Sequence, residues 1–382
     1  MQNADRLVFL DNLRTFLVFL VIVIHAGAVY ESSGIFGLFW IVDDPSTSDL
    51  PGLVNLVLDI FVMATIFFIS GYVTPGSVDR HGTKRYLVAR MRRILIPWAL
   101  AAATLIPLYK VVFLYSRGMP QEHWTSYFHF TNGFVSMNWL WYLPVLFVFD
   151  CLYVVLRHAG VSLGGLRVRN AVGIVLVVGF AYSWTMSLTE STGWTKTALI
   201  DFQNERLLIY FLYFALGALC YRQRAFDGAP SRWGFAIASA TAWVPVVLYG
   251  ALVINLLLDT GSYVVSARGD VVMLWIAFHL ALGSLVFLSL DIARRWFDRP
   301  RPLGKLLAPH AYGVYVVHMA VLAGPAVLLL NTAIPAILKY SLLVVVTYTG
   351  SVVVSLLLRR FASRLPARPT PRMATASPDH GA

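Results

Sequence analysis

The stretch DNLRTFLVFLVIVIH, residues 11–25, combines charge and hydrophobicity in a way that predicts the fold of the whole chain. Ten residues separate Arg14 from His25, and all of them except Thr15 are apolar. The segment is hydrophobic enough to cross a bilayer as a helix, with His25 inside the hydrocarbon layer. A titratable ring at that depth costs stability unless it is paired or lines a wet cavity, so His25 is a candidate functional residue.

The spacing places the polar residues of this stretch on one face of the predicted helix. Arg14 and His25 are about three turns, or roughly 16 Å, apart along the axis. Asp11 lies on the same face and can pair with Arg14 where the helix leaves the headgroups. Two interpretations stay open: the three residues act together in a site, or Arg14 is an ordinary cytoplasmic flank and His25 a hydrogen-bonded packing residue.

The composition is that of a polytopic membrane protein, since 58% of the 382 residues are hydrophobic and only 13% are charged. The net charge of +11 is typical of basic cytoplasmic loops, so we expect a lipid bilayer and no nucleic acid as partner. The two cysteines, Cys151 and Cys220, lie in apolar segments, which excludes a disulfide framework or a Cys-based metal site. No cleavable signal peptide is expected, because the first apolar run lacks a small-residue cleavage site.

Ten apolar runs are long enough to be membrane-spanning helices, although the sixth is short. The predicted fold is therefore all-α, with about ten transmembrane helices in residues 1–358. Of the 30 Lys and Arg residues, 24 fall on the side of the termini, which predicts that both termini are cytoplasmic. Residues 359–382 form a basic, Pro-rich cytoplasmic tail that we expect to be disordered. The predicted helices lie near residues 13–30, 53–73, 94–115, 138–156, 171–188, 207–221, 234–258, 271–290, 306–330 and 335–358.

A cluster of arginines follows the second predicted helix: Arg90, Arg92 and Arg93, with Pro97 four residues farther on. In a regular helix Arg90 and Arg93 share a face, and two guanidinium groups at that spacing can bind phosphates at the membrane surface. Such phosphates would belong to a phosphorylated cytosolic donor. The alternative is a stop-transfer cluster that contacts lipid phosphate.

The ninth predicted helix carries Tyr312, Tyr315 and His318 at three-residue intervals. His318 lies about as far from the cytoplasmic end of its helix as His25 does from the start of the first, so the two rings are expected at one depth. His279, Asp59 and Asp150 are further polar residues in apolar runs, and we expect each of them to be satisfied by a neighbouring helix.

Two aromatic stretches are expected at the outer surface of the membrane. Trp141 belongs to the Trp-rich start of the fourth helix and is first of all an interfacial anchor, with a substrate wall as the second interpretation. Loop 116–137 is aromatic as well and contains His123 and His129. Its rings suit the headgroup level first and sugar stacking second.

Together these motifs resemble the membrane-bound acyltransferase-3 family. The resemblance extends over residues 6–358 and is strongest to the stand-alone members, among them the acyltransferases that add succinyl groups to periplasmic glucans. Trp139 stands where members often have His, and Ala311 where they often have Ser before the Tyr of the ninth helix. The motifs that carry the resemblance are Leu10-Asp11-Asn12-Leu13, Arg14 with ten residues to His25, Phe67-Phe68-Ile69-Ser70-Gly71-Tyr72, Arg90 to Arg93 before Pro97, Trp141-Tyr142-Leu143 and Tyr312 to His318.

The resemblance implies an enzyme of the bacterial inner membrane. It would transfer an acyl group from a cytosolic acyl-CoA, as co-substrate and with no bound cofactor or metal, to a hydroxyl of a periplasmic or cell-surface carbohydrate. Arg90, Arg92 and Arg93 would bind the CoA phosphates, with Arg14 close to the same surface. His25 would act as general base or form an acyl-histidine, and His318 or Tyr315 would polarise the carbonyl or orient the acceptor.

The competing class of function is a secondary transporter or flippase for a small polar or glycan substrate, which also uses buried ionisable residues in a helical bundle. Such proteins more often show inverted repeats or helices broken by Gly and Pro. Pro107, Pro144, Pro245 and Pro325 leave this alternative open.

Overall fold

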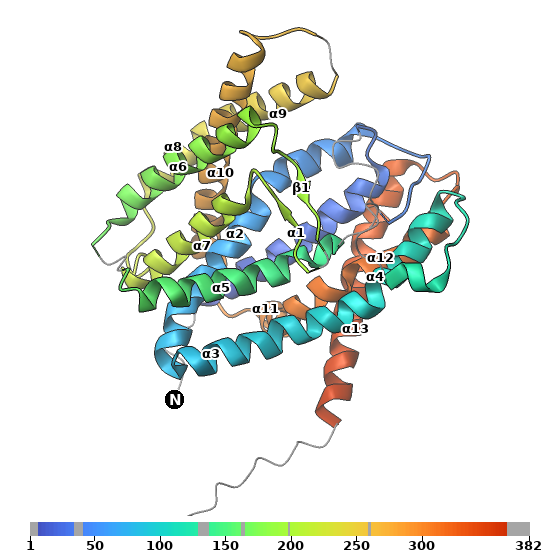
Figure 1. The fold of residues 1–382 in the computed structure, drawn as a ribbon, viewed down its shortest axis with the longest axis horizontal. Helices are drawn as coiled ribbons and strands as arrows, with labels where there is room; N and C mark the ends of the chain where they lie inside the picture. Colours follow the sequence, from blue (N-terminus) through green and yellow to red (C-terminus); the bar gives the residue numbers. More distant parts are fainter. Residues whose placement is uncertain are drawn as a thin grey trace, which may run out of the picture.

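The chain is a bundle of long helices, shown by a computed structural model that describes residues 7–33, 41–128, 137–161, 165–197, 199–258 and 261–364 (Figure 1). Nine helical segments of these residues are long and apolar enough to cross a membrane, and α7 is a shorter apolar helix. The predicted all-α polytopic membrane fold is confirmed. The first helices are α1 (Val8–Tyr30), α2 (Asp49–His81), α3 (Thr83–Arg90), η1 (Met91–Leu95), α4 (Ile96–Ser116), η2 (Trp124–Phe128), η3 (Asn138–Trp141), α5 (Tyr142–His158) and α6 (Val168–Leu188). The others are α7 (Leu207–Arg222), α8 (Arg232–Thr241), α9 (Trp243–Leu257), α10 (Ala267–Trp296), α11 (Pro302–Leu307), η4 (Ala308–His310), α12 (Ala311–Leu329) and α13 (Ala336–Arg364).

Helices α1 and α2 form the centre of the bundle. Helix α1 packs against α2, α10, α12 and α13, and α2 packs most extensively against α7. The contact between α2 and α7 is made backbone to backbone at two glycines. A Cβ on Gly71 would lie 1.9 Å from the carbonyl oxygen of Phe214, and one on Gly217 would lie 2.1 Å from that of Phe68. Small residues of this kind let membrane helices approach closely and gain dispersion energy.

The third membrane-spanning segment runs without interruption from Thr83 to Ser116 but contains one π-helical turn, η1. A π-helical turn has a wider hydrogen-bond spacing than the α-helix and is often found at functional sites. Here the turn spans Met91–Leu95 and separates α3 from α4. It therefore changes how Arg90 and Arg93 are directed relative to one another.

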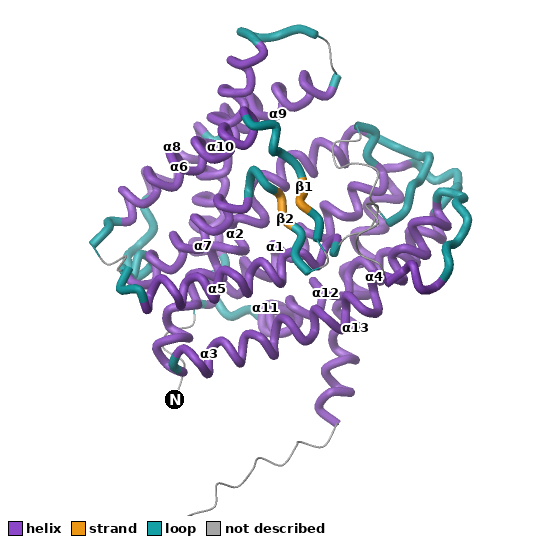
Figure 2. Tube along the Cα trace, in the orientation of Figure 1, coloured by secondary structure: helices purple, strands orange, loops and turns teal. Residues whose placement is uncertain are grey.

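Helix α7 is too short to cross the hydrocarbon layer by itself. Its 16 residues correspond to about 24 Å of helix, against roughly 30 Å of hydrocarbon. The chain before it forms a small antiparallel hairpin of β1 (Trp194–Thr195) and β2 (Phe202–Gln203), drawn in orange in Figure 2. The predicted fold is all-α, so the hairpin is an addition to it.

A buried ion pair ties the segment between α1 and α2 to the start of α13. The Nζ atom of Lys339 donates to both carboxylate oxygens of Asp44, at 3.0 and 2.9 Å, and neither side chain is exposed. The backbone N–H of Ser46 donates to the same carboxylate at 2.9 Å. Several partners are what a buried charge requires in order to be tolerated.

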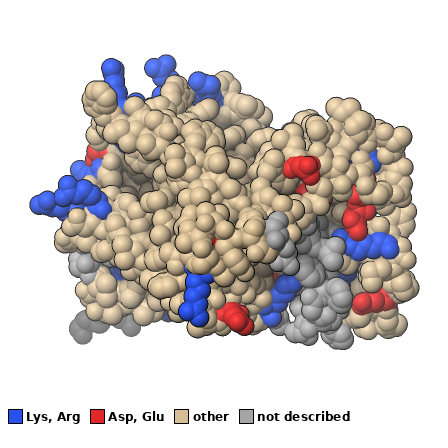
Figure 3. All heavy atoms as spheres, turned by 90° about the horizontal axis from the view of Figure 1, so that it is seen from above, with Lys and Arg blue, Asp and Glu red and all other residues tan. Residues whose placement is uncertain are grey.

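The first and last helices have their terminal ends on the lower side of Figure 1. Basic side chains project from the left end of the face in Figure 3, and most of the acidic side chains on that face lie in its right half. The compartment of each end stays a prediction. Helix α13 continues to Arg364, which includes the first six residues of the predicted tail, and residues 365–382 lie outside the described residues, as does His129.

Candidate active site

The rings of His25 in α1 and His318 in α12 are in direct contact inside the bundle. Their centroids lie 4.9 Å apart with an interplanar angle of 64°. His25 is half-buried and His318 is fully buried. The expectation that the two rings lie at one depth is confirmed. Two histidines brought together by helices from opposite ends of the chain form the centre of the candidate site.

Hydrogen bonds to the backbone fix the neutral tautomer of each ring. The Nδ1 atom of His25 lies 2.7 Å from the carbonyl oxygen of Val21, and that of His318 lies 2.6 Å from the carbonyl oxygen of Tyr315. A carbonyl oxygen only accepts, so Nδ1 donates in both rings and Nε2 carries the lone pair. The Nε2 atom of His318 is buried and has no hydrogen-bond partner within the described part of the chain. The pair therefore offers two proton-accepting nitrogens.

The aromatic residues Trp139 of η3 and Tyr315 of α12 lie next to His318. The indole N–H of Trp139 donates to the carbonyl oxygen of Val316 at 3.0 Å, and the Tyr315 hydroxyl donates to the carbonyl oxygen of Trp139. The ring of Trp139 is T-shaped to that of His318, with centroids 6.4 Å apart. These reciprocal bonds hold η3 against α12, so the Trp at position 139 has a definite structural role. Because the Tyr315 hydroxyl is used in this contact, Tyr315 supports the site rather than donating into it.

Asn55 of α2 holds the backbone of α1 next to His25. Its Nδ2 atom donates to the carbonyl oxygen of Ile24 at 2.9 Å, and the side chain is fully buried. A Cβ on Gly27 would lie 2.7 Å from Oδ1 of Asn55, so the glycine makes room for the amide. Asn55 is not among the residues predicted from the sequence, although an Asn within the apolar run Leu53 to Leu58 indicates a buried polar group that needs a partner.

The predicted arginine cluster is divided by the π-helical turn. Arg92 and Arg93 are exposed and line an open groove of about 580 Å³ together with Lys84 and Arg85. Four cationic side chains around one groove at the end of a membrane helix suit an anionic, phosphorylated ligand. The sequence analysis did not assign Lys84 and Arg85 to this role.

Arg90 is directed into the bundle instead of into the groove. Its Nε atom lies 3.1 Å from Oδ2 of Asp150 and 3.0 Å from the Tyr86 hydroxyl, to which it donates. Tyr86 in turn donates to Oδ1 of Asp150 at 2.6 Å, and Thr74 donates to the same oxygen at 3.2 Å. The structure thus brings Arg90 together with Asp150, not with Arg92 and Arg93. The predicted satisfaction of Asp150 by neighbouring helices is confirmed.

One stripe of α12 leads from the groove to the histidines. The Tyr312 hydroxyl donates to the carbonyl oxygen of Ile94 in the π-helical turn, at 3.4 Å. Tyr315 follows one turn later, and His318 one turn after that. Six residues of helix correspond to about 9 Å, which is the axial distance from Tyr312 to His318 along α12.

The start of α1 carries the predicted pair of Asp11 and Arg14. Their closest atoms, Oδ1 and Nη2, lie 3.4 Å apart, and the Arg14 side chain is 41% exposed. Exposed pairs of this kind add little stability, so Arg14 keeps the freedom to bind a ligand at this end of the bundle.

The remaining predicted polar residues also have partners on neighbouring helices. Nη1 of Arg206, which precedes α7, donates to Oδ2 of Asp59 at 2.7 Å, and His279 lies 3.2 Å from the Ser183 hydroxyl. Trp141 packs against Trp194 of the hairpin and Tyr210 of α7, with centroids 5.5 and 5.7 Å away. Trp141 therefore contacts protein on two sides.

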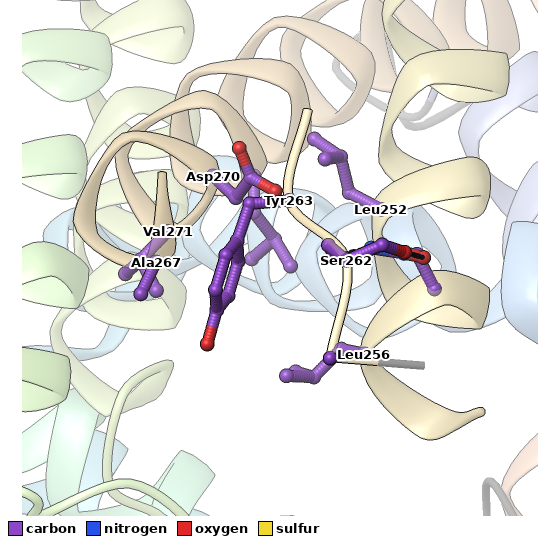
Figure 4. A pocket seen from close by; sticks show the side chains of 10 residues that line it. Leu252, Leu256, Ser262, Tyr263, Ala267, Asp270 and Val271 are labelled. Atoms are coloured by element: carbon purple, nitrogen blue, oxygen red, sulfur yellow. Dashed lines mark hydrogen bonds between the residues drawn. The ribbon is translucent and has the colours of Figure 1, made fainter. Parts of the chain in front are cut away.

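A separate small pocket of about 110 Å³ lies between the end of α9 and the start of α10 (Figure 4). Tyr263 and Asp270 line it, but the Asp270 carboxylate accepts the backbone N–H groups of Val264 and Val265 at 2.9 and 3.0 Å. This carboxylate caps the loop before α10. The predicted site residues do not line this pocket.

Comparison with known proteins identifies similar chains in enteric bacteria. The chain is 27% identical over 264 residues to glucans biosynthesis protein C of Escherichia coli O139:H28 (strain E24377A / ETEC). It is 25% identical over 265 residues to the protein of the same name in Salmonella heidelberg (strain SL476). Each match covers 64% of this chain and 66% of the relative, so the chain spans slightly less than two thirds of the length of these relatives. No solved structure matches the chain.

The family comparison covers almost the whole chain. The model of the acyltransferase-3 family, described as an acyltransferase domain, matches residues 7–360. This range includes the histidine pair, the arginine groove and every membrane-spanning helix of the described residues. The chain belongs to the membrane-bound acyltransferase-3 family.

Proposed function

We propose that the protein transfers an acyl group from a cytosolic acyl-CoA to a hydroxyl group of a carbohydrate on the outer side of the inner membrane. The observation that carries the proposal is the contact between His25 and His318, both with Nδ1 bonded to backbone, inside a bundle whose one end bears a cationic groove. Membership of an acyltransferase family and relatives named for glucan biosynthesis support it.

The groove is suited to the donor. Lys84, Arg85, Arg92 and Arg93 would bind the CoA phosphates, since guanidinium and ammonium groups form charge-assisted hydrogen bonds to phosphate. The axial distance of about 9 Å along α12 is short enough for a pantetheine arm to bring the thioester to the histidines. Arg14 is partly exposed near the start of α1 and would add a further positive charge for the donor.

The histidine pair is suited to general base catalysis. Nε2 of His25 would take the proton of the acceptor hydroxyl as its oxygen attacks the thioester carbonyl carbon. The carbon–sulfur bond then breaks, and the proton passes to the departing CoA thiolate, so that an ester and free CoA thiol are formed. Neutral His318 has no N–H on Nε2 and so does not polarise the carbonyl; it would accept a hydrogen bond that orients the acceptor or the protonated His25.

The test uses purified protein in proteoliposomes with radiolabelled acyl-CoA on one side and a soluble gluco-oligosaccharide on the other. We expect labelled oligosaccharide from the wild type, none from His25→Ala, and wild-type amounts from His158→Ala, a control at an exposed histidine at the end of α5. Equal labelling by wild type and His25→Ala would contradict the assignment of His25. Oligosaccharide that crosses the membrane unlabelled would instead favour the transporter alternative.

A further inference from the structure

The ion pair of Asp59 in α2 and Arg206, directly before α7, lies inside the membrane-spanning bundle, where an unpaired charge is costly. Nη1 of Arg206 donates to the carboxylate of Asp59 and also to its backbone carbonyl oxygen, at 3.0 Å. The Arg206 side chain is 6% exposed, whereas that of Asp59 is 34% exposed. Asp59 lies one helical turn from Asn55, which bonds to the backbone beside His25, so the carboxylate is at the depth of the histidines. An accessible carboxylate at that depth indicates a water-filled cavity.

The segment before the short helix α7 places irregular backbone at the same depth as this pair. The chain before Leu207 is not helical, and irregular backbone within a membrane is stable only where it is covered by protein or lines an aqueous cavity. Glu205 fixes this segment by accepting the backbone N–H of Gly193 at 2.7 Å and the side-chain amide of Gln203 at 2.6 Å. The hairpin is therefore anchored, not a loose loop.

Aromatic rings connect the hairpin to the charged pair. Trp194 of β1 is 47% exposed and packs edge to face on Trp141. Trp141 packs on Tyr210, which lies one turn after Arg206 and donates its backbone N–H to the carbonyl oxygen of Arg206 at 2.9 Å. A chain of packed side chains thus connects an exposed indole to a half-buried carboxylate. Phe67 is fully buried and contacts both Trp141 and Tyr142, which continues the chain of rings toward Tyr315 and the histidines.

We propose that Trp194, Trp141 and the Asp59–Arg206 pair form the subsite that binds a neutral pyranose unit of the acceptor. A pyranose has an apolar C–H face that packs on aromatic rings and hydroxyl groups that donate to a carboxylate. Asp59 has the accessibility to accept such hydroxyls, and Arg206 holds its carboxylate in place. This inference rests on the proposed function, because it assumes that the bound sugar directs a hydroxyl group toward His25. The binding of the sugar can nevertheless be measured without acyl transfer.

The experiment measures binding of neutral gluco-oligosaccharides to the full chain in lipid nanodiscs by calorimetry, with acyl transfer measured in parallel. We expect Trp194→Ala to weaken binding by about tenfold or more, because the exposed face of the stacking surface is lost, and Trp194→Phe to retain most of it. Asp59→Asn should weaken binding too, and thermal unfolding shows whether it folds. Trp233→Ala, at a tryptophan that is 80% exposed on α8, is the matched control.

The outcomes separate this subsite from the proposed function. Binding that depends on Trp194 in a protein with no transferase activity would support the subsite and contradict only the proposed function. Acyl transfer with an unchanged acceptor KM in Trp194→Ala would contradict the subsite and leave the function standing. A wild-type protein that binds no gluco-oligosaccharide at millimolar concentration would also overturn the subsite.

Discussion

The imidazole of His25 in the first helix meets that of His318 in the twelfth edge to face, with ring centroids 4.9 Å apart. Both Nδ1 atoms are bonded to backbone carbonyls of their own helices, so both Nε2 atoms present lone pairs. Because the rings are in contact, a positive charge on one imidazole disfavours a positive charge on the other. The two histidines therefore act as a unit, and the effects of replacing them on kcat should not be independent.

The first prediction concerns that unit. We expect His25→Ala to lower kcat by a factor of about 10² to 10⁴, the usual range for loss of a general base. His318→Ala should also lower kcat, and the double variant should be little worse than His25→Ala alone. The measurement is a double-mutant cycle on acyl transfer in proteoliposomes. Strictly multiplicative losses would show that the two histidines act separately.

The second prediction concerns the groove. Replacing Arg92 and Arg93 together by Ala should raise the KM for acyl-CoA by about tenfold or more with little change in kcat, because charge-assisted bonds to phosphate contribute about 1.5–3 kcal/mol each. The groove residues are exposed, so the melting temperature should not change. Steady-state kinetics with acyl-CoA as the varied substrate tests this. An unchanged KM would favour contact with lipid phosphate instead.

The third prediction separates Arg90 from its neighbours in the sequence. Arg90→Ala leaves the buried Asp150 carboxylate without its cation and should destabilise the fold by about 3–5 kcal/mol. Adding Asp150→Asn should recover part of that loss, because the unpaired charge is removed. Thermal unfolding in detergent measures both variants. If Arg90→Ala kept the wild-type melting temperature and only raised the KM for acyl-CoA, the buried pairing with Asp150 would be unimportant.

The fourth prediction concerns the contact between α2 and α7. Gly71→Ala and Gly217→Ala should each separate these helices and lower the thermal stability markedly, since a Cβ at either position would overlap a backbone carbonyl group. Gly173→Ala and Gly324→Ala are matched controls in α6 and α12, with no atom within 4 Å of the added Cβ. These controls should be neutral or gain about 0.5–1 kcal/mol from helix propensity. A similar response of all four variants would contradict the close contact.

The fifth prediction concerns the ion pair of Asp44 and Lys339. Lys339→Met should destabilise the protein by about 3–5 kcal/mol, because the buried carboxylate loses its cation. In the double variant with Asp44→Asn the loss should be smaller, and the difference between the two melting curves checks this. Equal losses in both variants would show that the charge of Asp44 is compensated by other groups.

Much of the fold could be predicted from hydropathy. A bilayer requires its spanning helices to be apolar over a fixed length, so the ten apolar runs locate the helices directly. Their ends were less accurate, since helices such as α2 continue into the polar region, to His81, where hydropathy gives no signal. The shared depth of His25 and His318 was predictable, because both residues lie about half a bilayer from the same ends of their helices, but their direct contact was not, since depth does not determine which helices are neighbours.

The partners of the charged residues could not be predicted in the same way. Arg90 was expected beside Arg93, but a single π-helical turn and the position of Asp150 decide its direction. The pairing of Asp59 with Arg206 depends on how α2 meets the start of α7, and no sequence pattern records that crossing. Asn55 was missed because one amide in an apolar run gives no indication of which backbone it will bind.

The π-helical turn at Met91–Leu95 has a consequence for how this segment tolerates change in length. The turn sets the rotation of the side chains of α3 relative to those of α4 within one continuous helix. Deleting a single residue within it would restore regular winding with the two halves still in register, whereas rewinding the same residues as a regular α-helix would rotate everything before the turn by about 100° relative to α4. The cationic side chains of α3 would then turn away from the groove, while the composition and length of the membrane span would hardly change.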